Sequence, residues 1–256
     1  MDYPVVEVKN ISLNYHDPDG ETKALKDISF SVHRGDFISI VGPSGCGKST
    51  LLSIIANLLK PSKGEVLING KPLSQSETTI GYMLQKDHLF EWRTIWQNVI
   101  LGLEIQNKLT SEALSFAESL LEKYGLYDFK DKKPSQLSGG MRQRAALIRT
   151  LVLEPEVLIL DEPFSALDYQ TRLYVCDEIG TIIRKENKTA ILVTHDISEA
   201  VSISDKVIVL SKRPAVISAV HDIEFASKVK SPMKAREEPE FRHYFNTIWK
   251  ELDLNV

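Results

Sequence analysis

The chain has 256 residues, 43% of them hydrophobic and 26% charged, and its 31 basic and 35 acidic side chains give a net charge of −4. This composition is ordinary for a globular protein, and the net negative charge argues against general nucleic-acid binding, which needs surplus Lys and Arg. Two cysteines, Cys46 and Cys176, are too few for a disulfide scaffold. The sequence lacks the pattern of a signal peptide and any apolar run of the ~18–20 residues that a membrane helix needs. We therefore expect a soluble chain that contacts a membrane only through a partner.

The first half of the sequence carries three kinds of strand signal. The first 35 residues alternate apolar and polar, which predicts two strands joined by a hairpin turn within His16–Lys23. The continuous apolar run Phe37–Val41 is typical of a strand that is buried on both faces. Helical spacing of leucines predicts a helix over Ser49–Leu59, and an Asn-Gly pair within Glu65–Leu73 predicts a second hairpin.

The second half alternates between helix and buried strand. The pattern is helical from about Trp92 to Leu153, and a further helix is predicted over about 170–184. Continuous apolar runs predict strands at Val157–Leu160, Ala190–Val193 and Val207–Leu210. This order favours a parallel sheet with crossover helices, into which a helical block is inserted. Near the end, aromatic residues at helical spacing after Pro239 predict an amphipathic helix whose aromatic face docks on the core.

A glycine-rich loop lies between the first buried strand and the first helix. Gly42–Ser49 fits the pattern G-x-x-x-x-G-K-[ST], in which glycines let backbone N–H groups turn toward a phosphate. The helix N-terminus adds partial positive charge, Lys48 supplies a full charge to the β- and γ-phosphates, and the Ser49 hydroxyl can bind Mg²⁺. We expect Cys46 to be a packing residue of the loop rather than a redox sensor, because no second cysteine lies near it in the sequence. The expected nucleotide contacts here are Gly42, Pro43, Ser44, Gly45, Cys46, Gly47, Lys48, Ser49 and Thr50.

Two carboxylates complete a nucleotide site. Asp161 and Glu162 directly follow the apolar run Val157–Leu160, at the strand end where open parallel sheets bind ligands. We expect Asp161 to bind Mg²⁺ through water, and Glu162 to orient or deprotonate an attacking water. Together with the loop, these residues indicate a P-loop NTPase.

A third motif narrows the class. Leu137–Arg144, LSGGMRQR, closely resembles the LSGGQ signature of ABC-family ATPases and precedes the two carboxylates, as in that family. Tyr15 stands where the family carries an aromatic residue that stacks on adenine, although a core tyrosine is the alternative at this position. The resemblance covers roughly residues 4–215. Three further elements resemble the family's Q-loop, D-loop and switch histidine: Gln85 in GYMLQ, Asp168 in SALD and His195 in VTHD.

The resemblance implies a RecA-like α/β P-loop NTPase core with a parallel sheet, an N-terminal antiparallel β subdomain and an inserted helical subdomain. It implies a nucleotide-binding core formed by residues 1–85 and 156–220. The helical subdomain with the signature would span residues 86–155, and a C-terminal extension with the amphipathic helix would span residues 221–256.

The resemblance also implies ATP and Mg²⁺ as cofactors of an ATPase. Glu162, His195 and Gln85 would be the catalytic residues, and Ser49, Gln85 and Asp161 would surround the metal. Because the signature lies on the helical block, it would cap the ATP of a second copy in a head-to-tail dimer, through Ser138, Gly139 and Gly140, with Asp168 also at the nucleotide. Met141 replaces the family's usual glutamine. We expect hydrolysis to survive this change, because Ser138 and the backbone N–H groups can still bind the γ-phosphate. A role of Met141 in packing alone is the alternative for its side chain.

A single cassette without membrane helices fits the separate ATPase subunit of a bacterial-type importer, peripheral at the cytoplasmic face of the membrane. The segments Val41–Leu52, Leu89–Trp92 and Lys212–Pro214 resemble nitrate, sulfonate and taurine importer ATPases. This resemblance implies a small organic anion as cargo, an integral-membrane permease as partner, a solute-binding protein as indirect partner, and no nucleic acid. The alternative is a soluble ABC ATPase in nucleic-acid maintenance or complex assembly.

The segment after Gln85 is unusually rich in aromatic side chains. Phe90 and Trp92 are expected to line a groove that receives a short cytoplasmic helix of the permease. The alternative is that both rings pack inside the helical block.

Overall fold

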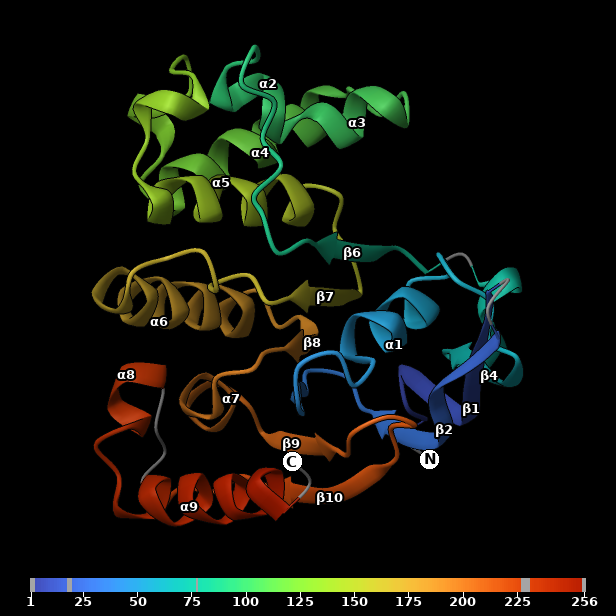
Figure 1. The fold of residues 1–256 in the computed structure, drawn as a ribbon. Helices are drawn as coiled ribbons and strands as arrows, with labels where there is room; N and C mark the ends of the chain where they lie inside the picture. Colours follow the sequence, from blue (N-terminus) through green and yellow to red (C-terminus); the bar gives the residue numbers. More distant parts are fainter. Residues whose placement is uncertain (1–2, 18–19, 77, 227–230, 255–256) are drawn as a thin grey trace.

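A computed structural model describes residues 3–17, 20–76, 78–226 and 231–254 (Figure 1). Its main sheet has the strand order β10-β9-β3-β8-β7-β6. The five strands from β9 to β6 pair in parallel, and β10 adds an antiparallel edge. The expected parallel sheet is therefore confirmed, with one antiparallel edge strand that the sequence did not predict. The strands are β3 (Phe37–Val41), β6 (Ile80–Met83), β7 (Val157–Asp161), β8 (Thr189–Val193), β9 (Lys206–Leu210) and β10 (Ile217–Asp222).

Helices cover both faces of this sheet, which is why its central strands carry almost only apolar residues. Helix α1 (Lys48–Ile55) packs on one face, against Ile159 and Ile191 among others. On the opposite face, α6 (Tyr169–Lys185) packs against Leu158 and Leu192, and α7 (Ile197–Ile203) lies beside it. Neighbouring residues of β7 and β8 thus point to opposite cores, as the pleat requires.

A second, antiparallel sheet packs beside α1 and has the order β2-β1-β4-β5. Its strands are β1 (Val6–Asp17), β2 (Gly20–Val32), β4 (Lys63–Ile68) and β5 (Lys71–Pro72). Both predicted hairpins are confirmed, and Asn69 and Gly70 have the positive φ values of 50° and 74° that such a turn needs. The turn expected over His16–Lys23 is narrower, because β1 and β2 extend through most of it; Pro18 and Asp19 lie outside the described residues.

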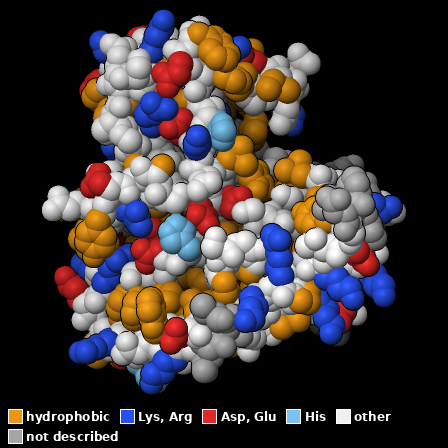
Figure 2. All heavy atoms as spheres, viewed as in Figure 1, with side chains coloured by type: hydrophobic (Ala, Val, Ile, Leu, Met, Phe, Trp, Pro, Cys, Tyr) orange, Lys and Arg blue, Asp and Glu red, His pale blue; other side chains and the backbone are white. Residues whose placement is uncertain are grey.

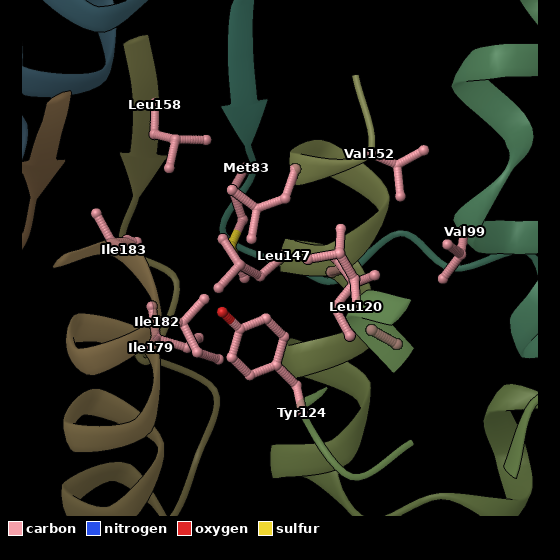
Figure 3. Packing of buried hydrophobic residues seen from close by; sticks show 14 of the residues in the cluster. Met83, Val99, Leu120, Tyr124, Leu147, Val152, Leu158, Ile179, Ile182 and Ile183 are labelled. Atoms are coloured by element: carbon pink, nitrogen blue, oxygen red, sulfur yellow. The ribbon is translucent and has the colours of Figure 1, made fainter. Parts of the chain in front are cut away.

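The helical block occupies the upper part of Figure 1. It contains α2 (Ile95–Val99), α3 (Leu101–Ile105), α4 (Ser111–Lys123) and α5 (Gly139–Leu151), with short 3-10 turns at Tyr127–Phe129 and Pro134–Gln136. Figure 3 shows the ring of Tyr124, directly after α4, between Leu147 of α5 and the isoleucines of α6. The Tyr124 hydroxyl donates to Glu186, which also pairs with Lys123 at 2.6 Å. The block is thereby packed against α6, while its expected boundaries at residues 86 and 155 stay a prediction.

The C-terminal part differs in detail from the expectation. After β10, the chain forms α8 (Pro232–Ala235) and α9 (Pro239–Leu254), and α9 is the predicted amphipathic helix. Its Ile248 is fully buried, but Trp249 is 57% exposed, so only part of the apolar face docks on the core. Figure 2 shows hydrophobic side chains gathered at the lower left, in the region of α8 and α9. None of the helices in the described ranges has the length and hydropathy to cross a bilayer.

Candidate active site

The carboxyl ends of the five parallel strands meet at one edge of the main sheet, where open α/β sheets bind ligands. A pocket of about 550 Å³ opens at this edge. Asp and Glu side chains gather near the centre of the face that Figure 2 shows. The pocket is lined by Ser44, Gly45, Gly47, Lys48, Ser49, Thr50, Glu162, His195 and Arg213.

The glycine-rich loop after β3 forms the floor of the pocket. Gly45 and Gly47 adopt φ values of 72° and 125°, a backbone region that other residues rarely enter. A Cβ at Gly47 would also lie 2.9 Å from Cδ2 of Leu25. The ammonium group of Lys48 donates to the carbonyl oxygens of Gly42 at 2.8 Å and Pro43 at 3.0 Å. The loop therefore holds a buried positive charge directly at the N-terminus of α1, which suits a phosphate group.

Cys46 lies within the loop, and its side chain is 2% exposed. A Cβ at Gly42 would lie 3.0 Å from its sulfur, so the thiol packs against the loop backbone. Burial raises the pKa of the Cys46 thiol, although Lys48 and Arg213 act in the opposite direction. A buried thiol with a raised pKa is a poor nucleophile. These observations support the expected role of Cys46 as a packing residue of the loop.

Ser49 and Asp161 stand together as the pair expected around Mg²⁺. The Ser49 hydroxyl donates to Oδ1 of Asp161 at 3.0 Å, and the Tyr82 hydroxyl donates to Oδ2 at 3.2 Å. Burial raises the pKa of Asp161, against the effect of these two hydrogen bonds. A cation at this carboxylate would offset the cost of burying its charge. Hydroxyl and carboxylate oxygens beside a phosphate-binding loop are the donor set that Mg²⁺ takes in P-loop NTPases.

Glu162 and His195 form the second polar pair of the pocket. Oε2 of Glu162 lies 3.0 Å from Nδ1 of His195, and the histidine side chain is 54% exposed. Glu162 has a φ of 45°, which is rare for a residue with a Cβ and is often found at functional sites. Its backbone is held on both sides: its N–H donates to the Val193 carbonyl, and its carbonyl accepts from the Ser165 hydroxyl.

Gln85 does not line the pocket. Its Nε2 donates to Oγ of Ser165 at 3.2 Å, and Ser165 in turn donates to the carbonyl of Glu162. The Q-loop residue is therefore connected to the Glu162 backbone through one serine. Its expected metal contact stays a prediction.

The signature residues also lie outside the pocket of their own chain. Ser138 caps α5, because its hydroxyl accepts from the Met141 N–H at 3.3 Å. A Cβ at Gly140 would come within 2.8 Å of Cγ2 of Val175, so this glycine also permits close packing on α6. The side chain of Met141 packs against the core, as the packing alternative predicts. Gly139 opens α5 directly after the cap.

Asp168 caps another helix. Its Oδ1 accepts from the Thr171 N–H at 3.1 Å at the start of α6, and hydrogen bonding from the side chain and then the backbone of Thr171 lowers the pKa of Asp168. The D-loop aspartate thus has a local structural role, and its contact with nucleotide stays a prediction.

Tyr15 is not among the residues that line the pocket, but it contacts one of them, Thr50. The hydroxyl of Tyr15 lies 3.2 Å from Oγ1 of Thr50, and its ring is 38% exposed, so it is not a core tyrosine. Stacking of this ring on adenine stays a prediction. Arg213 follows β9 and was not among the expected site residues, although it lines the pocket. A basic residue just beyond a buried parallel strand is the signal that could have found it.

Comparisons with known proteins agree with this geometry. A family model for the ABC transporter matches residues 25–165. The uncharacterized ABC transporter ATP-binding protein YtlC of Bacillus subtilis is 49% identical over 97% of this chain and 95% of its own length. The taurine import ATP-binding protein TauB of Roseobacter denitrificans is 36% identical over 95% of this chain and 94% of its own length.

Among solved structures, the chain resembles the dimeric post-hydrolysis state of the ATP-binding cassette MJ0796 bound to ADP and Pi. The TM-score is 0.72 and the identity 32%, over 86% of this chain and 99% of that one. This likeness confirms the expected α/β cassette fold. The chain therefore belongs to the ABC transporter family and is one of its ATP-binding subunits, an ATPase that uses ATP with Mg²⁺.

Proposed function

We propose that the chain powers the import of a small organic anion, such as a sulfonate, nitrate or taurine, through a separate membrane permease. The likeness to a taurine import protein along nearly the whole chain supports the direction of transport and the class of cargo. The hydrolytic role rests on the 3.0 Å contact between Glu162 and His195 beside the phosphate loop. In this role the chain would lie at the cytoplasmic face of the membrane as a peripheral subunit.

In the proposed reaction each pocket residue has one task. Lys48 and the loop N–H groups bind the phosphates, and Tyr15 stacks on the base. Mg²⁺ held by Ser49 and Asp161 would neutralise charge on the β- and γ-phosphates. Glu162 orients the attacking water and accepts its proton.

His195 is the γ-phosphate sensor of this proposal. Its Nδ1 faces Glu162, so the histidine can hold the carboxylate in place while its exposed side remains accessible from the pocket. Gln85 reaches the same glutamate from the other side, through Ser165. A change at either residue is therefore transmitted to Glu162 over one or two hydrogen bonds.

We also propose a head-to-tail dimer as the hydrolysing form. Ser138, Gly139 and Gly140 stand at the N-terminus of a 13-residue helix, which suits an anion, yet they lie outside the pocket of their own chain. The dimeric cassette with ADP and Pi is a structural precedent for such an arrangement. In it, Asp168 and the signature of one copy would complete the site of the other.

The permease would dock on the segment after Gln85. Phe90 and Trp92 stack with ring centroids 4.7 Å apart and are 37% and 72% exposed, so Trp92 does not pack inside the helical block. The neighbouring segment is fixed by Arg142, which pairs with Asp87 at 2.9 Å. Because Arg142 lies on the signature helix α5, the proposed docking surface is joined directly to the element that would cap the second ATP.

The decisive experiment is purification of the tagged full-length chain from membranes of its own cells, followed by identification of the proteins that accompany it. Recovery of an integral-membrane protein and its solute-binding protein would support import. The complex in vesicles would then be tested with taurine, nitrate and an alkyl sulfonate, and stimulation of ATP hydrolysis by one of them would assign the cargo. Recovery of soluble partners alone would contradict the proposal and favour the alternative of a soluble ATPase.

A further inference from the structure

The loop that carries His195 is tied to the buried Glu199 on both sides of the histidine: Thr194 bonds the carboxyl group of Glu199, and Asp196 bonds its backbone N–H. Thr194 donates to Oε2 of Glu199 at 2.5 Å, and the same hydroxyl accepts from the N–H of Asp196 at 3.0 Å. Asp196 caps α7, where its Oδ1 accepts from the N–H of Glu199 at 3.3 Å. Glu199 is 3% exposed and does not line the nucleotide pocket. The position of His195 therefore depends on where Glu199 lies.

Arg172 reaches this cluster from the opposite side. It lies in the first turn of α6, directly after the SALD segment (residues 165–168), and its guanidinium donates to the carbonyl of Leu167 at 3.0 Å. The same group lies 3.7 Å from Oδ2 of Asp196 and 3.9 Å from Oε1 of Glu199. One side chain thus spans from the SALD backbone to the loop that carries the histidine.

The contact between Arg172 and Glu199 is incomplete. Nε of Arg172 is buried and has no hydrogen-bond partner among the described residues. A buried N–H without an acceptor is costly, and the carboxylate that could accept from it lies just beyond hydrogen-bond distance. A shift of less than an ångström of α6 relative to α7 would close this gap. The structure shows the cluster with this gap open, and closing it would satisfy the Nε of Arg172.

We propose that Arg172 and Glu199 are positioning residues that couple the SALD segment to His195. This inference rests on the proposed function, in which a second copy docks at the SALD segment and His195 contacts the γ-phosphate. Docking would press the Leu167 carbonyl and Arg172 toward Glu199 and close the gap. Glu199 would then fix Thr194 and Asp196, and with them the histidine between them.

The charge state of Glu199 sets the strength of this link. Burial raises the pKa of Glu199 to about 7, with Asp196 acting in the same direction and Thr194, Arg172 and His195 acting against it. Cys176 of α6 interacts electrostatically with the carboxyl, and its buried thiol has a raised pKa and stays neutral. Only the ionised carboxylate attracts Arg172 as a full charge. The link is therefore stronger above about pH 7 than below it.

The test compares Arg172→Gln and Glu199→Gln with wild type in the purified full-length chain. Glutamine at 199 keeps the volume and the acceptor for Thr194 and removes the charge. We expect kcat for ATP hydrolysis to fall about tenfold in each variant, with the affinity for ATP unchanged. The double variant should be no slower than either single one, because both remove the same link.

Two further readouts separate coupling from loss of structure. Arg184→Gln is the matched control, since Arg184 lies near the other end of α6 and pairs with Asp205 at 2.9 Å. It should keep the wild-type kcat even if it lowers the melting temperature. The rise of kcat through about pH 7 should persist in wild type and in this control, and should be absent in Glu199→Gln.

The experiment distinguishes failure of the Arg172–Glu199 coupling from failure of the proposed function. Wild-type kcat and pH profile in Glu199→Gln would overturn the coupling, as would equal losses in Arg184→Gln. If Arg172→Gln does not fold, Glu199→Gln decides alone. His195→Ala is measured beside them: full activity there would contradict the proposed role of the histidine, whereas its inactivity beside unaffected Arg172 and Glu199 variants would refute only the coupling.

Discussion

The Ser49 hydroxyl donates to Asp161 at 3.0 Å, although the two residues are 112 positions apart in the chain. Ser49 lies in the first turn of α1, after β3, and Asp161 ends β7, two strands away in the sheet. Because both strands run in the same direction, their carboxyl ends bring the hydroxyl and the carboxylate to the same edge. The contact between Ser49 and Asp161 therefore results from the order of the strands in the sheet and not from any local sequence motif.

Glu162→Gln should abolish ATP hydrolysis and preserve ATP binding. The substitution removes the carboxylate that accepts the proton of water, while the phosphate loop and the Ser49–Asp161 pair stay intact. We expect the turnover rate to fall by about 10²–10⁴. Hydrolysis is measured by phosphate release and binding by fluorescence of a nucleotide analogue.

Glu156→Gln is the control for this variant, because Glu156 stands just before β7 and Glu162 just after it. Glu156 accepts from Asn69 at 2.8 Å and pairs with Arg34, far from the pocket lining. Its loss should leave hydrolysis unchanged. Equal hydrolysis by Glu162→Gln and wild type would remove Glu162 from the catalytic role.

Much of this site could be predicted from the sequence, because its loop and its two carboxylates directly follow buried strands. Arg213 was missed because it stands three residues beyond β9, in a segment whose pattern resembles importer ATPases but does not by itself indicate a contact with nucleotide. Its place in the pocket depends on Ala215, which pairs with Leu25 of the other sheet and so directs the segment back over the loop. A contact between two sheets leaves no local pattern in the sequence.

Arg213→Ala should weaken ATP binding by roughly two- to fivefold, the range expected for an exposed charge. Lys48→Ala should weaken it more, by about tenfold to a hundredfold, because a buried charge opposite the phosphates is lost. Titration calorimetry measures both affinities. Lys212→Ala removes the same charge from the adjacent residue, which does not line the pocket, and should bind ATP like wild type.

Ser138→Arg should block the ATP-dependent dimer that Glu162→Gln traps. The isolated chain is expected to be largely monomeric without ATP, and a bulky side chain at Ser138 would occupy the place of the opposite γ-phosphate. Light scattering with and without ATP measures the dimer. Ser138→Ala is the control: it removes the cap of α5, at a cost of about 1 kcal/mol, without adding bulk, and should still dimerise. A dimer that forms without ATP and tolerates Ser138→Arg would contradict the head-to-tail arrangement.

Glu199 should make the free energy of unfolding fall as the pH rises. Burial raises its pKa in the folded chain from 4.5 to about 7, so between these values the folded state binds more protons than the unfolded state. Stability is then lost on raising the pH through this window, by on the order of 3 kcal/mol, and does not change further above it. Urea unfolding at several pH values should show this fall in wild type and not in Glu199→Gln. Glu118→Gln, at an exposed position of α4, should follow the wild-type curve.

The fold was predictable where periodicity is strong and length is sufficient. β3 and β8 are buried at every position, and α6 is 17 residues long, so each has a clear pattern. β6 has only four residues, and β10 is a half-buried edge strand, so neither stands out from its surroundings. α1 ends at Ile55 rather than Leu59, because Asn57 adopts a φ of 60° and turns the chain out of the helix. Whether such a short segment forms a strand, and where a helix ends, depends on residues that are close in space but distant in the sequence.

Phe90→Asp should separate membrane association from catalysis. The backbone of Phe90 is clamped by the fully buried Asn98, which accepts from its N–H at 2.7 Å and donates to its carbonyl at 3.1 Å. These bonds do not involve the Phe90 side chain, so the segment should keep its shape in the variant. We expect the ATPase activity of the free chain to be nearly intact, because this segment does not line the nucleotide pocket.

In cells, the same variant should lose its association with the membrane fraction, since a charge would replace one ring of the stacked pair with Trp92 at the proposed docking surface. Ile105→Asp is the matched control, because Ile105 is 72% exposed at the end of α3 in the same helical block. It should remain associated with the membrane and active. Loss of both properties in Phe90→Asp, with aggregation, would show that the ring supports the core instead. Loss of neither would mean that the permease docks on another surface, since an aspartate cannot replace a ring in an apolar contact without a measurable loss of affinity.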